Sequence, residues 1–318
     1  MAFYSSAKYV FFAFLFLCST QLQANDFKPF YEQSELGKID WDEGMIYGVG
    51  KGYLKHNRHS KIHALRAARA LAFQSIVKLA ATVKVNDRNT ITEFGNGSML
   101  VHLEAFVSGY EEVGNRSVDG SNPYIEITYR VPLHGVNGVG AKLLEKVGMV
   151  QKGDDFTLAE AEDEVWLVLD AREVSGKQVS PALFPKIVSA TETLYQVDKS
   201  LDKASLVTRG MASYVSTNER LEGAAPGDKS AWIEHILSIV VADAHAGERK
   251  KRRRYIVKKV EDIKGLYNTN LVVSEADAKS IKAANNSSGI LQKTRVVVVV
   301  SSAIGGIEGA LEYQFGLR

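Results

Sequence analysis

The sequence contains almost no cysteine: Cys18 is the single one in 318 residues. Because Cys18 lies within an apolar amino-terminal run, we expect it to be removed with a signal peptide, which leaves the mature chain with none. Disulfide bonds, cysteine nucleophiles and thiolate metal sites are then excluded. A chain of this length without disulfides must be held together by its own apolar core.

An excess of charge of either sign is also missing. The chain has 39 Lys and Arg against 37 Asp and Glu, a formal net charge of +2. This balance argues against a general nucleic-acid-binding protein, for which a strongly basic surface is typical. The 45% hydrophobic and 24% charged residues are those of an ordinary globular protein.

No apolar run is long enough to predict a membrane-spanning helix. The longest amino-terminal run, Tyr9–Cys18, has ten residues, whereas a spanning helix needs about 20. Lys8 precedes the run and a small residue, Ala24, follows it, an order typical of a secretory signal peptide. We predict cleavage after Ala24 and, because bulky residues precede Cys18, a mature chain that is not lipidated. The expected location is the periplasm or the outer membrane.

The remaining chain predicts two α+β domains, each an antiparallel or mixed sheet packed with one or two helices. The expected organisation is a signal peptide at 1–24, a linker at 25–44, a first domain at 45–150, and a second domain at 151–318 with an insertion at 216–259.

In the first domain, apolar residues at steps of three and four predict a helix over Ser60–Val83, whose alanines allow a close approach to a sheet. Four segments predict strands: Met45–Leu54, Thr82–Asn86, Met99–Tyr110 and Tyr124–Val131. A turn is expected before the last of them, and a second helix over Gly138–Val147.

In the second domain, Val165–Leu169 predicts a short buried strand, and Asp228–His245 a helix. A further helix is predicted to begin after Ser274, which has a capping-box spacing to Asp277, and to stop at Gly289. The valines of Thr294–Val300 predict a core strand flanked by strands on both sides.

Motifs for catalysis are absent. The glycines of Gly48–Gly52 lack the spacing of a phosphate-binding loop, and glycines in a strand more often mark a bulge or close packing. His56, His59 and His63 lie among Lys and Arg residues, whose charge opposes a bound cation. We therefore predict no catalytic residue, no cofactor and no metal ligand.

The most prominent local feature is a run of six adjacent cations. Adjacent like charges repel each other unless a partner supplies negative charge, which makes the run a candidate anion- or partner-binding site. The alternative is a solvated surface at the end of a helix, where cations complement the helix dipole. We expect an exposed surface that does not support the fold. The run consists of Arg249, Lys250, Lys251, Arg252, Arg253 and Arg254.

Two sets of segments resemble one group of bacterial envelope proteins. Gly48–Gly52, Ala64–Ala72 and Val83–Val85 resemble the LPP-twenty-like (LPP20-like) lipoproteins, and more loosely the amino-terminal domain of flagellar assembly protein T. Pro181–Ile187 and Asn270–Ala278 are similar to the carboxy-terminal half of longer proteins of that group. The chain differs from the lipoproteins in having no lipidation signal.

The resemblance implies a non-enzymatic cell-envelope protein that binds other proteins, assembling with itself as a homo-oligomer or with a surface or flagellar basal-body structure. It implies no catalytic residues. Two other functions stay open: a module that uses the basic run to bind peptidoglycan or anionic lipid headgroups, and an enzyme whose site forms only on folding. Nucleic acid is not an expected partner.

Overall fold

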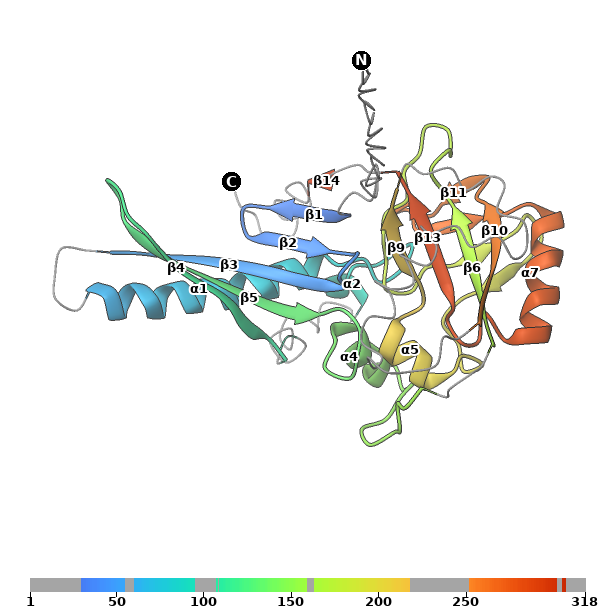
Figure 1. Ribbon diagram of the computed structural model, residues 1–318, viewed down its shortest axis with the longest axis horizontal. Helices are drawn as coiled ribbons and strands as arrows, with labels where there is room; N and C mark the ends of the chain where they lie inside the picture. Colours follow the sequence, from blue (N-terminus) through green and yellow to red (C-terminus); the bar gives the residue numbers. More distant parts are fainter. Residues whose placement is uncertain are drawn as a thin grey trace, which may run out of the picture.

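Figure 1 shows the computed structural model of the chain, in which residues 30–54, 60–94, 107, 109–158, 163–217, 252–301 and 305–306 are described. The fold is α+β, as predicted. A six-stranded sheet is built mainly from residues 31–132, and two four-stranded sheets are built from residues 163–300. The predicted signal peptide at 1–24 lies outside the described residues.

The strands of the six-stranded sheet are antiparallel except for the pairing of β1 with β14. Their order is β14-β1-β2-β3-β5-β4. The strands are β1 (Tyr31–Ser34), β2 (Gly37–Asp40), β3 (Met45–Tyr53), β4 (Glu111–Val118), β5 (Tyr124–Pro132) and β14 (Gly305–Gly306).

The first two strands correct the prediction of a linker at 25–44. β1 and β2 form a hairpin that pairs with β3, and Ile39 and Trp41 are buried beside it. Each of these strands has only four residues, too few for the alternation of apolar and polar residues to be visible in the sequence.

Helix α1 (Ser60–Thr82) covers one face of the sheet, as predicted, and packs on β3 through glycines. A methyl group at Gly50 would lie 2.1 Å from the carbonyl oxygen of Ala68, and one at Gly52 would lie 1.9 Å from that of Ala64. The helix backbone therefore touches the strand backbone. The glycines of Gly48–Gly52 serve close packing, the structural alternative to a phosphate-binding loop.

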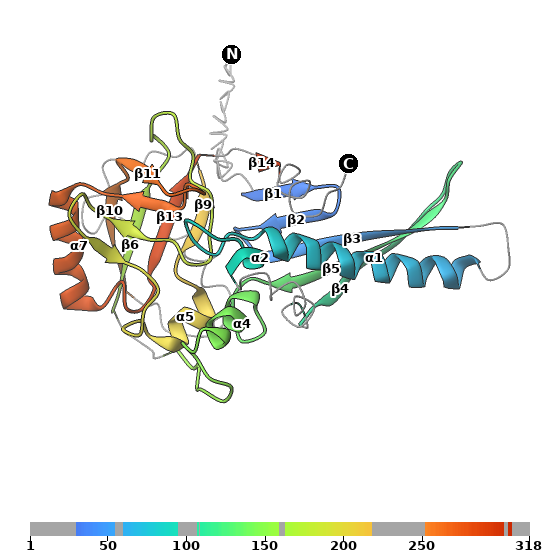
Figure 2. The same ribbon diagram turned by 180° about the vertical axis from the view of Figure 1, so that it is seen from behind.

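Figures 1 and 2 show α1, β3, β4 and β5 running side by side away from the rest of the molecule, and we call these four elements the arm. Strand β4 was not predicted, because its residues are polar and mostly exposed. It pairs with β5 in antiparallel register, and ion pairs connect the two strands, with Arg116 at 2.7 Å from Glu126 and Arg130 at 2.9 Å from Glu111. Most of the strand predicted at 99–110 lies outside the described residues.

The first four-stranded sheet has the order β10-β6-β13-β9, and its three pairings are all parallel. It contains β6 (Asp163–Asp170), β9 (Ser213–Ser216), β10 (Arg252–Lys259) and β13 (Val296–Val300). All five valines of β13 are buried, as expected for a central strand of a sheet covered on both faces. The prediction that this strand has neighbours on both sides is confirmed.

The second four-stranded sheet has the order β11-β12-β7-β8. Its strands are β7 (Ile187–Val188), β8 (Thr193–Tyr195), β11 (Asp262–Lys264) and β12 (Asn270–Val272), and the remaining helices are α2 (Ile91–Phe94), α4 (Val139–Lys146), α5 (Lys203–Arg209) and α7 (Glu275–Ser288). Both predicted ends of α7 are confirmed. Ser274 accepts a hydrogen bond from the Asp277 amide, and Gly289 ends the helix with a φ of 66°.

The two parts of the chain are joined by backbone hydrogen bonds. The amides of Leu183 and Phe184 donate to the carbonyl oxygens of Lys84 and Val85, at 2.9 and 2.8 Å. The ring of Trp41 meets that of Tyr214 edge-on at 5.7 Å. These contacts place the base of the arm directly against the sheets of the second part. Within the described ranges, no helix is long and apolar enough to cross a membrane.

Candidate functional site

The basic run predicted as a binding site leads into strand β10. Arg252, Arg253 and Arg254 are the first three residues of this strand. The other three cations, at 249–251, lie outside the described residues, and only the backbone of Arg252 is described. The strand runs parallel to β6 over eight residue pairs. The run thus enters the sheet, which corrects the expectation that it does not support the fold.

Strand β10 is an edge strand of its sheet. Among the described residues it pairs with β6 alone. An outer strand presents backbone amide and carbonyl groups away from its neighbour, which a further strand can use. Successive side chains of a strand point to opposite faces, so Arg253 and Arg254 enter two different environments.

On one face of the sheet, the carboxylate of Glu164 in β6 contacts two arginines, Arg253 and Arg295, and its charge acts on a third, Arg209. We call Glu164, Arg209, Arg253 and Arg295 the arginine cluster. The Arg253 Nε lies 3.4 Å from one carboxylate oxygen, and an Arg295 Nη lies 3.5 Å from the other. The Trp166 indole also donates to Glu164, at 3.3 Å. The Arg209 guanidinium lies 5.7 Å from the centre of the Trp166 ring, within the range of a cation–π contact.

The cluster is largely withdrawn from water. The side chains of Glu164 and Arg295 are 5% and 3% exposed, and that of Arg253 is 18% exposed. Burial lowers the pKa of Arg295, and the charge of Glu164 opposes this. Burial also lowers the pKa of Arg209, and the neighbouring Arg295 and Arg253 add to the effect. The guanidinium groups therefore lie close to one another in a poorly solvated environment.

An ion pair at the opposite end of β6 has a different geometry. Arg172 holds Asp170 with two hydrogen bonds, from its Nε at 2.9 Å and an Nη at 2.8 Å. That bidentate geometry is the strong form of the arginine–carboxylate contact. The contacts of Glu164 are longer, and one carboxylate is shared among several donors.

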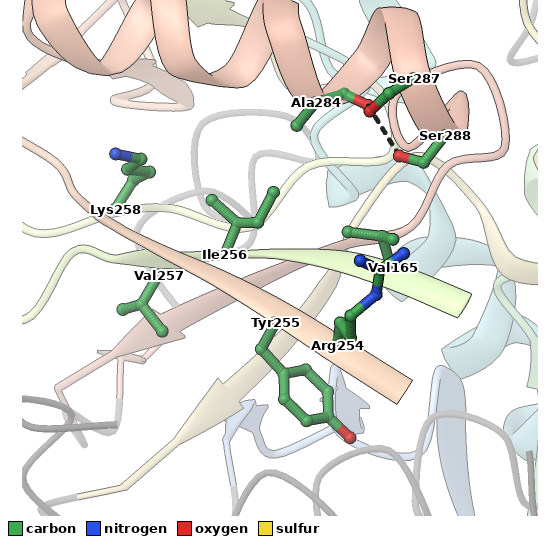
Figure 3. Close-up of a pocket in the computed structure, with 9 residues that line it drawn as sticks. All are labelled: Val165, Arg254, Tyr255, Ile256, Val257, Lys258, Ala284, Ser287 and Ser288. Atoms are coloured by element: carbon green, nitrogen blue, oxygen red, sulfur yellow. Dashed lines mark hydrogen bonds between the residues drawn. The ribbon is translucent and has the colours of Figure 1, made fainter. Parts of the chain in front are cut away.

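On the other face, β10 and helix α7 border a groove of about 560 Å³, which we call the α7 groove. Its apolar lining includes Val165, Ile256 and Ala284, and its cations are Arg254 and Lys258. Figure 3 shows Ile256 and Lys258 pointing toward α7 and Tyr255 pointing to the opposite side. Lys258 pairs with Asp277 at 2.7 Å, whereas Arg254 is exposed.

The other polar residues considered in the sequence do not converge on a site. His63 is exposed on α1, and His56 and His59 lie outside the described residues. His134 is packed against Gly210, and burial lowers its pKa to about 4. Burial raises the pKa of Asp42 to about 7. The Asp42 carboxylate accepts a hydrogen bond from the Phe30 amide. In the part of the chain that the structure describes, no group of three or more His, Cys, Asp or Glu side chains is placed to hold a metal ion.

Comparison with known proteins finds a similarity in the second part of the chain. Residues 166–302 match the sequence family described as the second domain of Treponema pallidum Tp0624. The match begins within β6, ends just after β13 and covers less than half of the chain. It includes the three arginines of the cluster, and Glu164 lies just before it. No curated protein matches the chain.

The sequence analysis did not single out Glu164, Arg209 or Arg295. Arg209 and Arg295 are single charges at a helix end and next to an apolar strand, and Glu164 is one of three adjacent acidic residues. A signal was present: Arg295 directly precedes the five valines of Val296–Val300, and Glu164 precedes Val165–Leu169. Charges at the same end of two adjacent parallel strands come together. The sequence does not show that β6 and β13 are parallel neighbours, so the proximity of Glu164 and Arg295 could not be predicted from it.

Proposed function

We propose that this protein is a non-enzymatic component of the bacterial cell envelope, which assembles with itself or with a surface or flagellar basal-body structure. It would act in the periplasm or at the outer membrane after removal of its signal peptide near Ala24. The proposal draws on the sequence resemblance to envelope proteins and on the geometry of β10.

The observation that carries the proposal is the α7 groove beside an outer strand. Among the described residues β10 pairs on one side only, and the groove beside it combines apolar side chains with Arg254. A partner segment could add to the strand through its backbone and place apolar side chains in the groove, a common mode of peptide recognition. Because Lys258 already pairs with Asp277, the preference for an acidic segment would come from Arg254.

Site-specific crosslinking tests this proposal. The chain has a single cysteine, Cys18, in the predicted signal peptide, so an introduced cysteine is unique in the mature protein. Ser287 lines the α7 groove, and Ser121 is exposed in the turn between β4 and β5. We expect a photocrosslinker on Ser287→Cys to capture an envelope protein or a second copy in isolated envelopes. The same label on Ser121→Cys reports whether the far end of the arm also makes contacts.

The yield of the crosslinked adduct should depend on the charge of the α7 groove. Adding Arg254→Glu to Ser287→Cys should reduce the adduct at low salt, because a reversed charge repels an acidic partner. Lys264→Glu is the matched control, since Lys264 is exposed on β11 and makes the same charge change away from the groove. Absence of any adduct from either cysteine, or equal adducts in both charge variants, contradicts the proposal.

A second candidate function is supported by the arginine cluster. Arginine side chains of the kind that contact Glu164 here can also hold an anionic ligand such as a peptidoglycan carboxylate or a lipid headgroup phosphate. This function uses the opposite face of β10 from the α7 groove, so the two can be tested separately.

A further inference from the structure

We propose that the outer edge of β4 is the surface through which two copies of this protein meet, with their β4 strands antiparallel across a two-fold axis. Glu111 near the beginning of the strand then faces Arg116 of the second copy, and Arg116 faces the second copy's Glu111. The inference deepens the proposed self-assembly and rests on it. It uses neither the α7 groove nor the arginine cluster.

Strand β4 is the outermost strand at one side of the six-stranded sheet. Among the described strands it pairs with β5 alone, and none of its eight residues is buried. It belongs to the arm, which projects from the rest of the molecule (Figures 1 and 2). The outer backbone amide and carbonyl groups of such a strand can pair with a further strand. The side chains of β4 determine which strand fits.

The charges of β4 are ordered along the strand. Glu111 and Glu112 are its first two residues, and Arg116 lies near its end. A strand that is acidic at one end and basic at the other is complementary to a copy of itself that runs in the opposite direction. A two-fold axis makes each contact twice, so both acidic ends meet a basic end.

A β-bulge in β4 brings the two charges to the same face of the sheet. In a regular strand, residues five positions apart point to opposite faces. The register of β4 against β5 shifts after Glu112. As a result, Glu111 lies opposite Arg130, and Arg116 lies opposite Glu126, which is four residues away on β5. Directly opposite residues of two paired strands share a face, so the bulge is what allows Glu111 and Arg116 of two copies to meet.

Both charged groups keep hydrogen-bonding capacity for a second copy. Arg130 donates twice to one oxygen of Glu111, at 2.9 and 3.1 Å, and the other oxygen has no donor among the described residues. Arg116 donates to Glu126 through its Nε at 2.7 Å, and its Nη groups have no acceptor among the described residues. The side chains of Glu111 and Arg116 are 64% and 67% exposed. A charge-assisted hydrogen bond between copies needs these two groups.

The pairing also continues an alternation of charge across the arm. Within one copy, Lys51 of β3 lies 3.9 Å from Glu126, which Arg116 also contacts. Glu111 and Arg130 of the second copy extend this row, so that every cation in it lies beside an anion. Opposite charges directly across a sheet stabilise it, and like charges destabilise it. A parallel pairing in register would instead place Glu111 beside Glu111, which favours the antiparallel arrangement.

Sedimentation equilibrium of the purified protein over a range of concentrations tests the interface. We expect the wild type to dimerise reversibly. Arg116→Glu should dimerise about tenfold more weakly, because the symmetric interface loses two favourable charge pairs. Arg66→Glu is the matched control, since Arg66 is exposed on α1 and makes the same charge change elsewhere on the arm. It should dimerise like the wild type.

Two outcomes would overturn the interface, and neither overturns the proposed function. A wild type that stays monomeric at every concentration excludes this dimer but leaves assembly with an envelope structure through the α7 groove. Equal dimerisation of Arg116→Glu and Arg66→Glu leaves self-assembly through a surface other than β4.

Disulfide trapping tests the register without a charge reversal. In a Cys18→Ser background, Glu111→Cys and Arg116→Cys are purified separately, mixed and mildly oxidised. Opposite residues of antiparallel strands lie about 4.5–5.5 Å apart, within reach of a disulfide, and the other Glu111–Arg116 contact of the mixed dimer stays intact. We expect disulfide-linked dimers in the mixture and few in either variant alone, where the cysteines are about 17 Å apart along the strand. No excess of linked dimer in the mixture would overturn the proposed pairing.

Discussion

The arm and the second part of the molecule are stabilised in different ways. In the arm, small residues let the backbone of α1 touch that of β3, and charged residues pair across an exposed strand. In the second part, a strand of five buried valines lies at the centre of a parallel sheet, and charges gather at one end of it. The contrast separates a projecting element held by close backbone packing from a core that carries a cluster of charged side chains at one end. Binding of an anionic group is therefore expected at the sheet of the second part.

The largest expected effect is on the core of the second part. Val298 is fully buried between β6 and β9, so Val298→Asp places an unpaired charge in the core. The cost should approach the whole stability of a domain, about 5–15 kcal/mol. We expect no soluble folded protein. Val136→Asp is the control, because Val136 is 56% exposed and should express and melt normally.

A smaller loss of stability is expected when a methyl group is added between α1 and β3 in the arm. In Gly50→Ala the new methyl group would meet the backbone of Ala68 and Ala72 at 2.1 and 2.2 Å, and backbone atoms cannot move aside as a flexible side chain can. We expect a loss of about 3 kcal/mol in urea unfolding. Gly114→Ala is the matched control, since its methyl group would meet the side chain of Thr128 at 3.1 Å and the nearest backbone atom, the Thr128 nitrogen, only at 3.8 Å. Equal losses in both variants would show that α1 does not sit on β3 as described.

The same contrast explains what the sequence could predict. The helix over Ser60–Thr82 and the strand Val296–Val300 were predicted because a regular apolar pattern marks a buried face. Strand β4 was missed because its stability comes from pairing with β5 and from ion pairs, which leave no local pattern. The arginine cluster depends on the parallel register of strands far apart in the sequence. Its members cannot be associated from spacing alone.

Two titrating groups should act on stability in opposite directions. The pKa of His134, 6.5 when unperturbed, is lowered to about 4 by burial. Between these values the unfolded chain binds the proton and the folded chain does not, so this group makes stability fall as the pH falls. His134→Asn should remove that contribution, which is at most about 1.4 kcal/mol per pH unit. Urea unfolding at pH 5 and pH 7 measures it.

Asp42 has the reverse effect. Burial raises its pKa from 3.8 to about 7, and the hydrogen bond from the Phe30 amide opposes the rise. Between these values the folded chain binds the proton and the unfolded chain does not, so stability falls as the pH rises. In Asp42→Asn we therefore expect stability to increase from pH 5 to pH 7, and in His134→Asn to decrease. Identical pH slopes in the two variants would contradict both assignments.

The central claim is that binding occurs at the basic end of β10. The most direct test compares co-sedimentation of the purified Arg254→Glu and Lys264→Glu variants with isolated envelopes at low and high salt. Both residues are exposed and both variants change the charge equally, but only Arg254 lines the α7 groove. We predict that Arg254→Glu loses most of its low-salt association, while Lys264→Glu sediments like the wild type and high salt removes the difference. Equal sedimentation of the two variants at low salt would contradict the account.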